Sequence, residues 1–259
     1  MKFDEIEDHL LRFWRELSHE HRALFAEVPE VAAALFQQDA VLYDTIIHLM
    51  LPNALKPLPL EGIQAIRQFA AKYEQWVTIA MAGHAPTLVA RKCEIAKVLV
   101  QQLRRHTALN HLAQAGRQVV GDPQRLAAML SDWNLLTFSE LLDQAAWVCE
   151  CRARDIHPIL DTEVRHLLAT GNQIEQWGAW VEGVANRFLD EGLEPQRYIY
   201  VARQVLLKWT YYANAVLRDL TFHSAPSYGS FHLVFLFCDA FFFYLVEQRI
   251  ANMKAFEQR

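Results

Sequence analysis

The chain has 259 residues, of which 53% are hydrophobic, and it contains only nine glycines and nine prolines. That balance leaves little material for tight turns and favours long helices around one large core. The formal net charge is -5 and the basic residues are scattered, which argues against a surface that tracks nucleic-acid phosphates. A disulfide framework is also disfavoured, so we expect a reducing, intracellular compartment and small buried thiols at Cys93, Cys149, Cys151 and Cys238.

The first half of the chain predicts four helices and one packed connector. Apolar residues recur at helical spacing from Ile6 to Leu17, and a second helix is expected to begin at Pro29. This second helix carries the apolar residues Val31, Leu35, Leu42, Ile46 and Leu49. Residues 51–59 hold three prolines and cannot continue a helix, but their leucines indicate a connector that lies along the core. Residues 60–81 and 86–120 then predict an antiparallel pair of long helices, the first with a buried stripe of Ile63, Ile66, Phe69, Tyr73, Trp76 and Ile79.

Helix signals continue through the second half. Asp122 is a predicted N-cap with Pro123 at the first helical position, and a further helix is expected from 137 to about 169. The last three helices are expected at residues 173–189, 195–221 and 230–253, the final one with Ser230 as its N-cap. No stretch alternates with the period of a strand. The predicted fold is therefore all-α, an extended multi-helix bundle with long antiparallel helices.

Two Glu-x-x-His pairs, Glu16 with His19 and Glu163 with His166, have the spacing that di-iron helical bundles use for metal ligands. Each pair lies off the apolar stripe of its own helix, so two solvated helix faces are the better interpretation. Cys149 and Cys151 lack a second ligand pair at zinc spacing, and residues 103–117 favour buried hydrogen bonds over catalysis. No phosphate-binding loop or nucleophile elbow is present. We therefore predict no metal, no cofactor and no enzymatic activity.

The most informative segment is the phenylalanine-rich stretch from Phe231 to Val246, which is apolar on both faces of a helix. Such a helix must bury both sides, either centrally in its own domain or partly against a partner chain. From the residues alone, the two alternatives are even. The apolar run at 233–246 is shorter than the about 20 residues that span a membrane, and it contains Asp239. No membrane association is expected.

Several segments resemble the dimerisation region of the RFX (regulatory factor X) transcription factors, and the resemblance covers about residues 42 to 249. It is most detailed at residues 207–212, 216–221 and 224–233, which read LKWTYY, VLRDLT and SAPSYGSFHL. Upstream matches lie at residues 42–44, 51–59, 65–70, 103–115, 129–132 and 146–149. Residues 1–41 and 150–200 match more loosely.

The resemblance implies an extended dimerisation region at 1–194 and C-terminal dimerisation helices at 195–259, forming one continuous unit. It implies a nuclear homodimer, with possible heterodimers between family paralogues, that holds two winged-helix domains on X-box promoter DNA; that domain is absent from this sequence. The alternative is a helical scaffold that recruits a different co-regulator protein through residues 60–120. The residues expected at the dimer interface, or supporting it, are Trp209, Tyr212, Arg218, Asp219, Phe231, Phe235 and Phe242.

Overall fold

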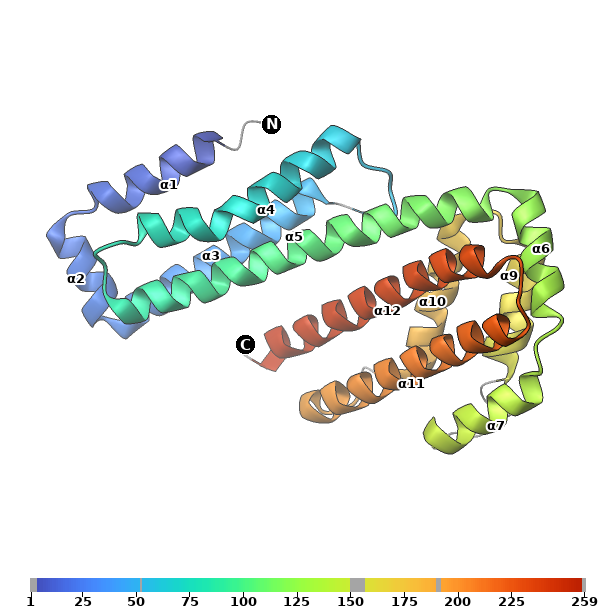
Figure 1. Cartoon of the computed structure of the whole chain (residues 1–259). Helices are drawn as coiled ribbons and strands as arrows, with labels where there is room; N and C mark the ends of the chain where they lie inside the picture. The colour runs from blue at the N-terminus through green and yellow to red at the C-terminus, as the bar shows by residue number, and fades with distance from the viewer. Residues whose placement is uncertain (1–3, 52, 150–156, 190–191, 258–259) are drawn as a thin grey trace. The chain divides into compact units, whose positions relative to one another are not determined.

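The computed structural model describes residues 4–51, 53–149, 157–189 and 192–257. Every regular element within these ranges is helical, as Figure 1 shows, and the all-α prediction is confirmed. The chain forms two compact units, Met1–Asn110 and His111–Arg259, and the division falls within the long helix α5 (Pro86–Val120). The predicted functional division between residues 194 and 195 stays a prediction.

The first unit contains α1 (Asp4–Glu16), α2 (His19–Glu27), α3 (Pro29–Met50), α4 (Leu60–Ala80) and the first part of α5. α4 and this part of α5 run antiparallel, as expected, and share a core with α1 and α3 (Figure 1). α2 was not predicted as a separate helix. None of its residues is fully buried, and Phe25 packs only partly buried against the core, so its apolar pattern is weak. The helix begins where the Ser18 hydroxyl accepts a hydrogen bond from the backbone N–H of His21.

The apolar residues noted on α3 are buried only in part, since Leu35 and Ile46 pack against the core. Leu42 and Leu49 are exposed, whereas Tyr43, Ile47 and the polar Asp39 are buried. Two polar contacts join the buried side of α3 to neighbouring helices. The Tyr43 hydroxyl lies 2.8 Å from the Tyr73 hydroxyl of α4, and Asp39 forms an ion pair with Lys92 of α5. A pattern based on leucines and isoleucines cannot detect a helix face that is buried through its polar groups.

The buried stripe of α4 was predicted correctly except at its end. The five predicted residues from Ile63 to Trp76 are all buried, but Ile79 is largely exposed. Val77 and Ala80 are buried in its place. In the last turn of α4 the buried side of the helix therefore carries Val77 and Ala80, and the larger Ile79 side chain lies outside it.

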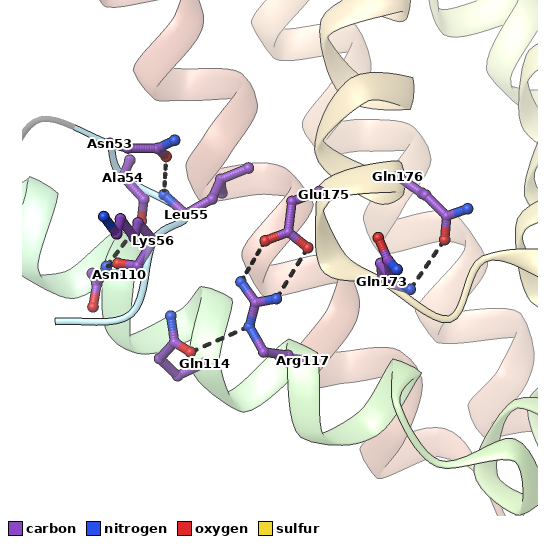
Figure 2. A network of polar contacts seen from close by, with 10 residues as sticks. All are labelled: Asn53, Ala54, Leu55, Lys56, Asn110, Gln114, Arg117, Gln173, Glu175 and Gln176. Carbon is purple, nitrogen blue, oxygen red and sulfur yellow. Dashed lines mark hydrogen bonds and ion pairs between the residues drawn. The ribbon is translucent and has the colours of Figure 1, made fainter.

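The proline-containing connector is packed, as predicted. Leu51 and Ala54 are buried, and the side-chain amide of Asn110 donates hydrogen bonds to the carbonyl oxygens of Ala54 at 3.1 Å and Lys56 at 2.7 Å (Figure 2). The Leu55 backbone N–H donates to the Asn53 side chain. Asn110 thus satisfies carbonyl groups that the connector cannot satisfy through helical bonds of its own, which confirms the predicted buried hydrogen bonding in residues 103–117.

His106 lies one turn before Asn110 on α5, and burial lowers the pKa of its imidazole from 6.5 to about 4, with a smaller contribution from His48. The folded unit therefore keeps this side chain neutral while the unfolded chain binds a proton below pH 6.5. The contribution of neutral His106 to the free energy of unfolding should be fully present above pH 6.5. It should decrease by about 3 kcal/mol as the pH falls toward 4. Denaturant unfolding across this pH range should show a smaller decrease in a His106→Gln variant, and equal decreases would contradict the assignment.

The second unit contains the end of α5 and seven further described elements. These are α6 (Pro123–Trp133), α7 (Phe138–Cys149), the π-helical turn η1 (Pro158–Glu163), α9 (Val164–Thr170), α10 (Ile174–Phe188), α11 (Pro195–Phe222) and α12 (Tyr228–Glu257). The Asp122 carboxylate accepts from the backbone N–H groups of Gln124 and Arg125, as the predicted N-cap of α6 should. The helix predicted from 137 to about 169 is found as α7 and, beyond residues 150–156, as η1 and α9.

The start of α12 differs from the prediction. The helix begins at Tyr228, so Ser230 lies inside its first turn and is not the N-cap. Residue 227 has the capping position instead, because its carbonyl oxygen accepts from the N–H groups of Ser230 and Phe231. The buried carboxylate of Asp132 on α6 in turn accepts hydrogen bonds from the backbone N–H and the hydroxyl of Ser227. A residue 95 positions earlier in the chain thus fixes this helix start, which no local signal could reveal.

α12 lies at the centre of the second unit and packs against α10 and α11, its antiparallel neighbour (Figure 1). Among the described residues it is the one helix long and apolar enough to cross a membrane, over the 24 residues Tyr228–Ala251. The helix is longer than the apolar run at 233–246 because it extends beyond that run at both ends. Core helices of globular proteins pass the same test, and 44% of this window is buried within the structure.

Candidate functional site

Aromatic stacking joins three helices at the centre of the second unit. Trp209 on α11 stacks on Phe242 of α12, with ring centroids 4.7 Å apart and an interplanar angle of 6°. Trp180 on α10 contacts Trp209, with ring centroids 5.6 Å apart. Phe242 is completely buried and Trp209 nearly so. This cluster fixes the position of α11 on α12.

A second aromatic cluster lies nearer the start of α12. Trp133 on α6 stacks with Phe231 and Phe235 at centroid distances of 5.6 and 6.4 Å. Tyr212 on α11 is also buried, and desolvation raises the pKa of its phenol well above the usual value. The predicted site residues Trp209, Tyr212, Phe231, Phe235 and Phe242 are therefore interior residues of the second unit.

Arg218 and Asp219 lie apart from these clusters. Arg218 is exposed on α11 and donates a hydrogen bond to the Gln144 side chain of α7 at 2.8 Å. Asp219 is half-buried, with a carboxylate oxygen 3.9 Å from the His223 imidazole. The structure does not gather the seven predicted residues into one exposed surface. Their assignment to the interface, or to its support, stays a prediction.

The outer face of α11 carries apolar side chains that face solvent. Tyr200 and Leu207 are each 65% exposed, and Tyr211 is partly exposed. At about 100° per residue these positions lie on the same side of the helix as Arg218, opposite Trp209. We call Tyr200, Leu207, Tyr211 and Arg218 the outer face of α11. The sequence offered one signal for it: residues 207 and 209 are both apolar but point to opposite sides, so a single packed face cannot bury both.

The ends of α5 and α10 within the second unit are joined by a bidentate ion pair. Arg117 donates to both carboxylate oxygens of Glu175 at 2.6 and 3.0 Å, and it also donates to Gln114 (Figure 2). These hydrogen bonds lower the pKa of the Glu175 carboxyl. Gln173 and Gln176 form the capping box that begins α10. The pair is partly exposed, so it orients the helices more than it stabilises them.

The Glu163 carboxylate has a structural role. It accepts hydrogen bonds from the Trp180 indole at 3.0 Å and from the Arg187 guanidinium at 2.7 and 3.0 Å. It is thus a partner in a polar cluster and not only a solvated side chain, whereas His166 is exposed. In the part of the chain that the structure describes, no three His, Cys, Asp or Glu side chains are grouped to hold a metal. Cys151 and the side chain of Cys149 lie outside the described residues.

Comparison with known proteins places this all-helical fold among transcription regulators. The RFX BCD domain matches residues 1–253. DNA-binding protein RFX2 of Danio rerio is 40% identical over 214 residues, covering 83% of this chain and 29% of the relative. MHC class II regulatory factor RFX1 of Mus musculus is 40% identical over 216 residues, covering 83% and 22% of the two chains. The chain belongs to the RFX family of transcription factors and corresponds to their BCD region.

The chain spans less than a third of the length of these relatives, which also include transcription factor RFX3 of Danio rerio, 39% identical over 83% of this chain and 28% of its own. No solved structure matches the chain. The predicted family is confirmed, and the relatives are transcription factors rather than enzymes.

Proposed function

We propose that the chain is a dimerisation and regulatory module in which two copies join through the outer face of α11. The observation that carries this proposal is the exposure of Tyr200 and Leu207 on a helix whose opposite side is fixed in the core by Trp209. Tyrosine and arginine, present here as Tyr200, Tyr211 and Arg218, are enriched at energetically important interface positions. A rigid helix with an apolar, aromatic outer side is suited to pair with a second copy of itself.

The buried aromatic residues support this surface from beneath. Trp209 and Phe242 hold α11 against α12, and Tyr212 lies on the same inner side of α11. Replacing Trp209, Tyr212 or Phe242 would change the interface only indirectly, by moving α11. The named interface residues of the proposal are therefore Tyr200, Leu207 and Arg218, with Trp209, Tyr212, Phe231, Phe235 and Phe242 as its internal support.

Replacing Leu207 with aspartate is expected to weaken self-association by about 100-fold or more, because a central apolar contact is lost and two carboxylates are brought together. Sedimentation velocity over a concentration series measures the change. Leu49→Asp is the matched control, since Leu49 is a similarly exposed leucine in the first unit. Both variants should keep wild-type circular dichroism. Equal effects of the two substitutions, or a wild-type chain that never dimerises, would remove the basis for this interface.

In the full-length context the module would hold two winged-helix DNA-binding domains in a fixed relation on X-box promoter DNA in the nucleus. Joining two binding domains makes the second binding event intramolecular and raises affinity by about 10² to 10⁴ without new base contacts. Heterodimers with family paralogues would use the same outer face. Membership of a transcription-factor family gives no support to the alternative, recruitment of a different co-regulator through residues 60–120.

A further inference from the structure

The side of α12 that faces solvent combines apolar and acidic side chains. Five residues recur on it at i, i+4, i+7, i+11 and i+15, and we call them the open face of α12: His232, Leu236, Asp239, Phe243 and Glu247. At about 100° per residue they lie within roughly 80° of one another around the helix. Leu236 is 39% and Phe243 is 43% exposed, and Asp239 is half-buried. The open face is therefore a single side of α12, and its apolar residues remain in contact with water.

The open face of α12 borders the outer face of α11. Burial raises the pKa of the Asp239 carboxyl, and the Trp209 and Thr210 side chains of α11 lie near enough to offset part of that rise. Arg203 is exposed seven residues before Thr210, so it lies on the same side of α11. Leu207 follows Arg203 by four residues, or about 40° further around the helix. One exposed surface therefore runs from the outer face of α11 across to α12.

The two helices carry opposite charges on this surface. The exposed charged side chains of α11 are all basic: Arg197, Arg203 and Arg218. The one acidic residue of α11, Asp219, is half-buried. On α12, Asp239 and Glu247 are the only Asp, Glu, Lys or Arg residues before Arg249. Packing α11 on α11 of a second copy would bring arginines toward arginines, whereas packing α11 on α12 of a second copy joins opposite charges.

Arg203 and Glu247 lie at about the same level along the α11–α12 pair. The stacked rings of Trp209 and Phe242 fix how the two antiparallel helices are aligned. Arg203 lies six residues before Trp209, or about 9 Å along α11, and Glu247 lies five residues after Phe242, or about 7.5 Å along α12. Because the helices are antiparallel, both displacements have the same direction.

This alignment allows both copies to make the same contact. A twofold axis that is parallel to the helices and lies in the contact plane places α11 of each copy antiparallel on α12 of the other and keeps every residue at its level. Arg203 then lies opposite Glu247 of the second copy, and Leu207 lies opposite Phe243 of the second copy. The symmetry repeats both contacts, so each copy contributes both halves of the interface.

The area of the surface also favours the use of both helices. Stable interfaces comprise roughly 20 to 30 residues on each side, whereas the outer face of α11 has four. The open face of α12 more than doubles that set and adjoins half-buried apolar neighbours, namely Leu206, Leu233 and Tyr244. α12 thus supplies contact area that α11 alone lacks.

We propose that the open face of α12 is the docking site for the outer face of α11 of a second copy, with an Arg203–Glu247 ion pair formed twice between the copies. This inference rests on the proposed function, because it names the surface that the outer face of α11 contacts. It makes the interface a bundle of four helices and gives Arg203 and Glu247 the role of selecting the partner surface.

Charge reversal tests the ion pair directly, with sedimentation velocity of the whole chain as the measurement. Arg203→Glu and Glu247→Arg should each weaken self-association at least about 10-fold, because each places like charges together twice. An equimolar mixture of the two variants should recover dimers close to the wild-type affinity, since both ion pairs of the mixed dimer join opposite charges. The double variant in one chain should recover them as well.

The matched controls reverse charges away from this surface. Arg104→Glu and Glu182→Arg alter exposed residues of α5 and α10 and should leave the dissociation constant unchanged, alone or mixed. All variants should keep wild-type circular dichroism, because the altered side chains are exposed. Equal weakening by the controls would mean that the total charge of the chain, and not this ion pair, governs association.

Three further results would overturn the proposal. A stronger dimer in Arg203→Glu would show that α11 packs on α11, and loss of dimers in Leu207→Asp without any effect of the charge reversals would separate α12 from the interface. Both leave pairing through α11 intact, whereas a wild-type chain that never dimerises removes the proposed function as well. Binding to phosphatidylcholine vesicles by the wild-type chain but not by Phe243→Asp would assign the open face to lipid.

Discussion

Replacing Phe242 with alanine is expected to lower the free energy of unfolding of the second unit by about 3 to 5 kcal/mol. Phe242 is fully buried, and its ring stacks on Trp209 at a centroid distance of 4.7 Å. The substitution removes both the buried apolar area and the stacked contact, and it leaves a cavity between α11 and α12 that a packed core closes only in part. Denaturant unfolding followed by circular dichroism measures the loss.

The neighbouring residue gives a matched control for this prediction. Phe243 is 43% exposed on the same helix, so Phe243→Ala removes an identical side chain from a site already in contact with water. Its effect should be a fraction of that at Phe242. Similar losses of unfolding free energy at the two positions would mean that α12 does not pack on α11 as described. Polar substitutions at Phe235 and Phe242 would likewise destabilise the fold, because both side chains are buried. Such variants therefore cannot locate a dimer surface.

Lys92→Met is expected to lower the stability of the first unit by about 3 to 5 kcal/mol, because it leaves a buried carboxylate without its partner. The Lys92 ammonium lies 2.6 Å from the Asp39 carboxylate, and their side chains are only 7% and 12% exposed. The same ammonium lies 5.0 Å from the centroid of the Trp14 ring. One cation thus joins α1, α3 and α5, and denaturant unfolding at pH 7 tests its contribution.

The double variant Lys92→Met with Asp39→Leu should recover most of the loss, since replacing both partners of a buried pair with apolar groups is often close to neutral. The exposed pair of Arg91 and Glu94, with N and O atoms 2.9 Å apart, is the control. Arg91→Ala should change stability by less than about 1 kcal/mol. If the double variant is as unstable as Lys92→Met, the cost comes from lost packing around the ammonium and not from the unpaired carboxylate.

Helix positions were predictable where the chain carries explicit backbone signals. Pro29, Pro86, Pro123 and Pro195 each occupy the first turn of a helix in the structure, where a missing N–H costs no hydrogen bond. The connector at 51–59 could be assigned as packed because prolines exclude a helix while its leucines favour burial. These are local properties, so one sequence is enough to predict them.

Burial faces were harder to predict where distant polar partners decide them. Asp39 and Tyr43 are buried because Lys92 and Tyr73 meet them from other helices, and no spacing within α3 reveals those partners. In the same way, the contact between Asp132 and Ser227 sets the start of α12 from far away in the sequence.

The predicted interface residues illustrate a related limit. α12 is apolar around most of its circumference, so its sequence cannot distinguish a core helix from an interface helix. The structure buries Phe231 and Phe242 and leaves Leu207 and Tyr200 of the neighbouring helix exposed. The dimer prediction therefore depends on α11, whose outer face the sequence indicated only through the contrast between Leu207 and Trp209.

The most direct test of the account is the mass of the purified chain by sedimentation velocity, measured from nanomolar to micromolar concentrations. The proposed interface predicts a dimer that dissociates on dilution and that Leu207→Asp converts to a folded monomer. A well-folded chain that sediments as a monomer at every concentration would contradict dimerisation through the outer face of α11.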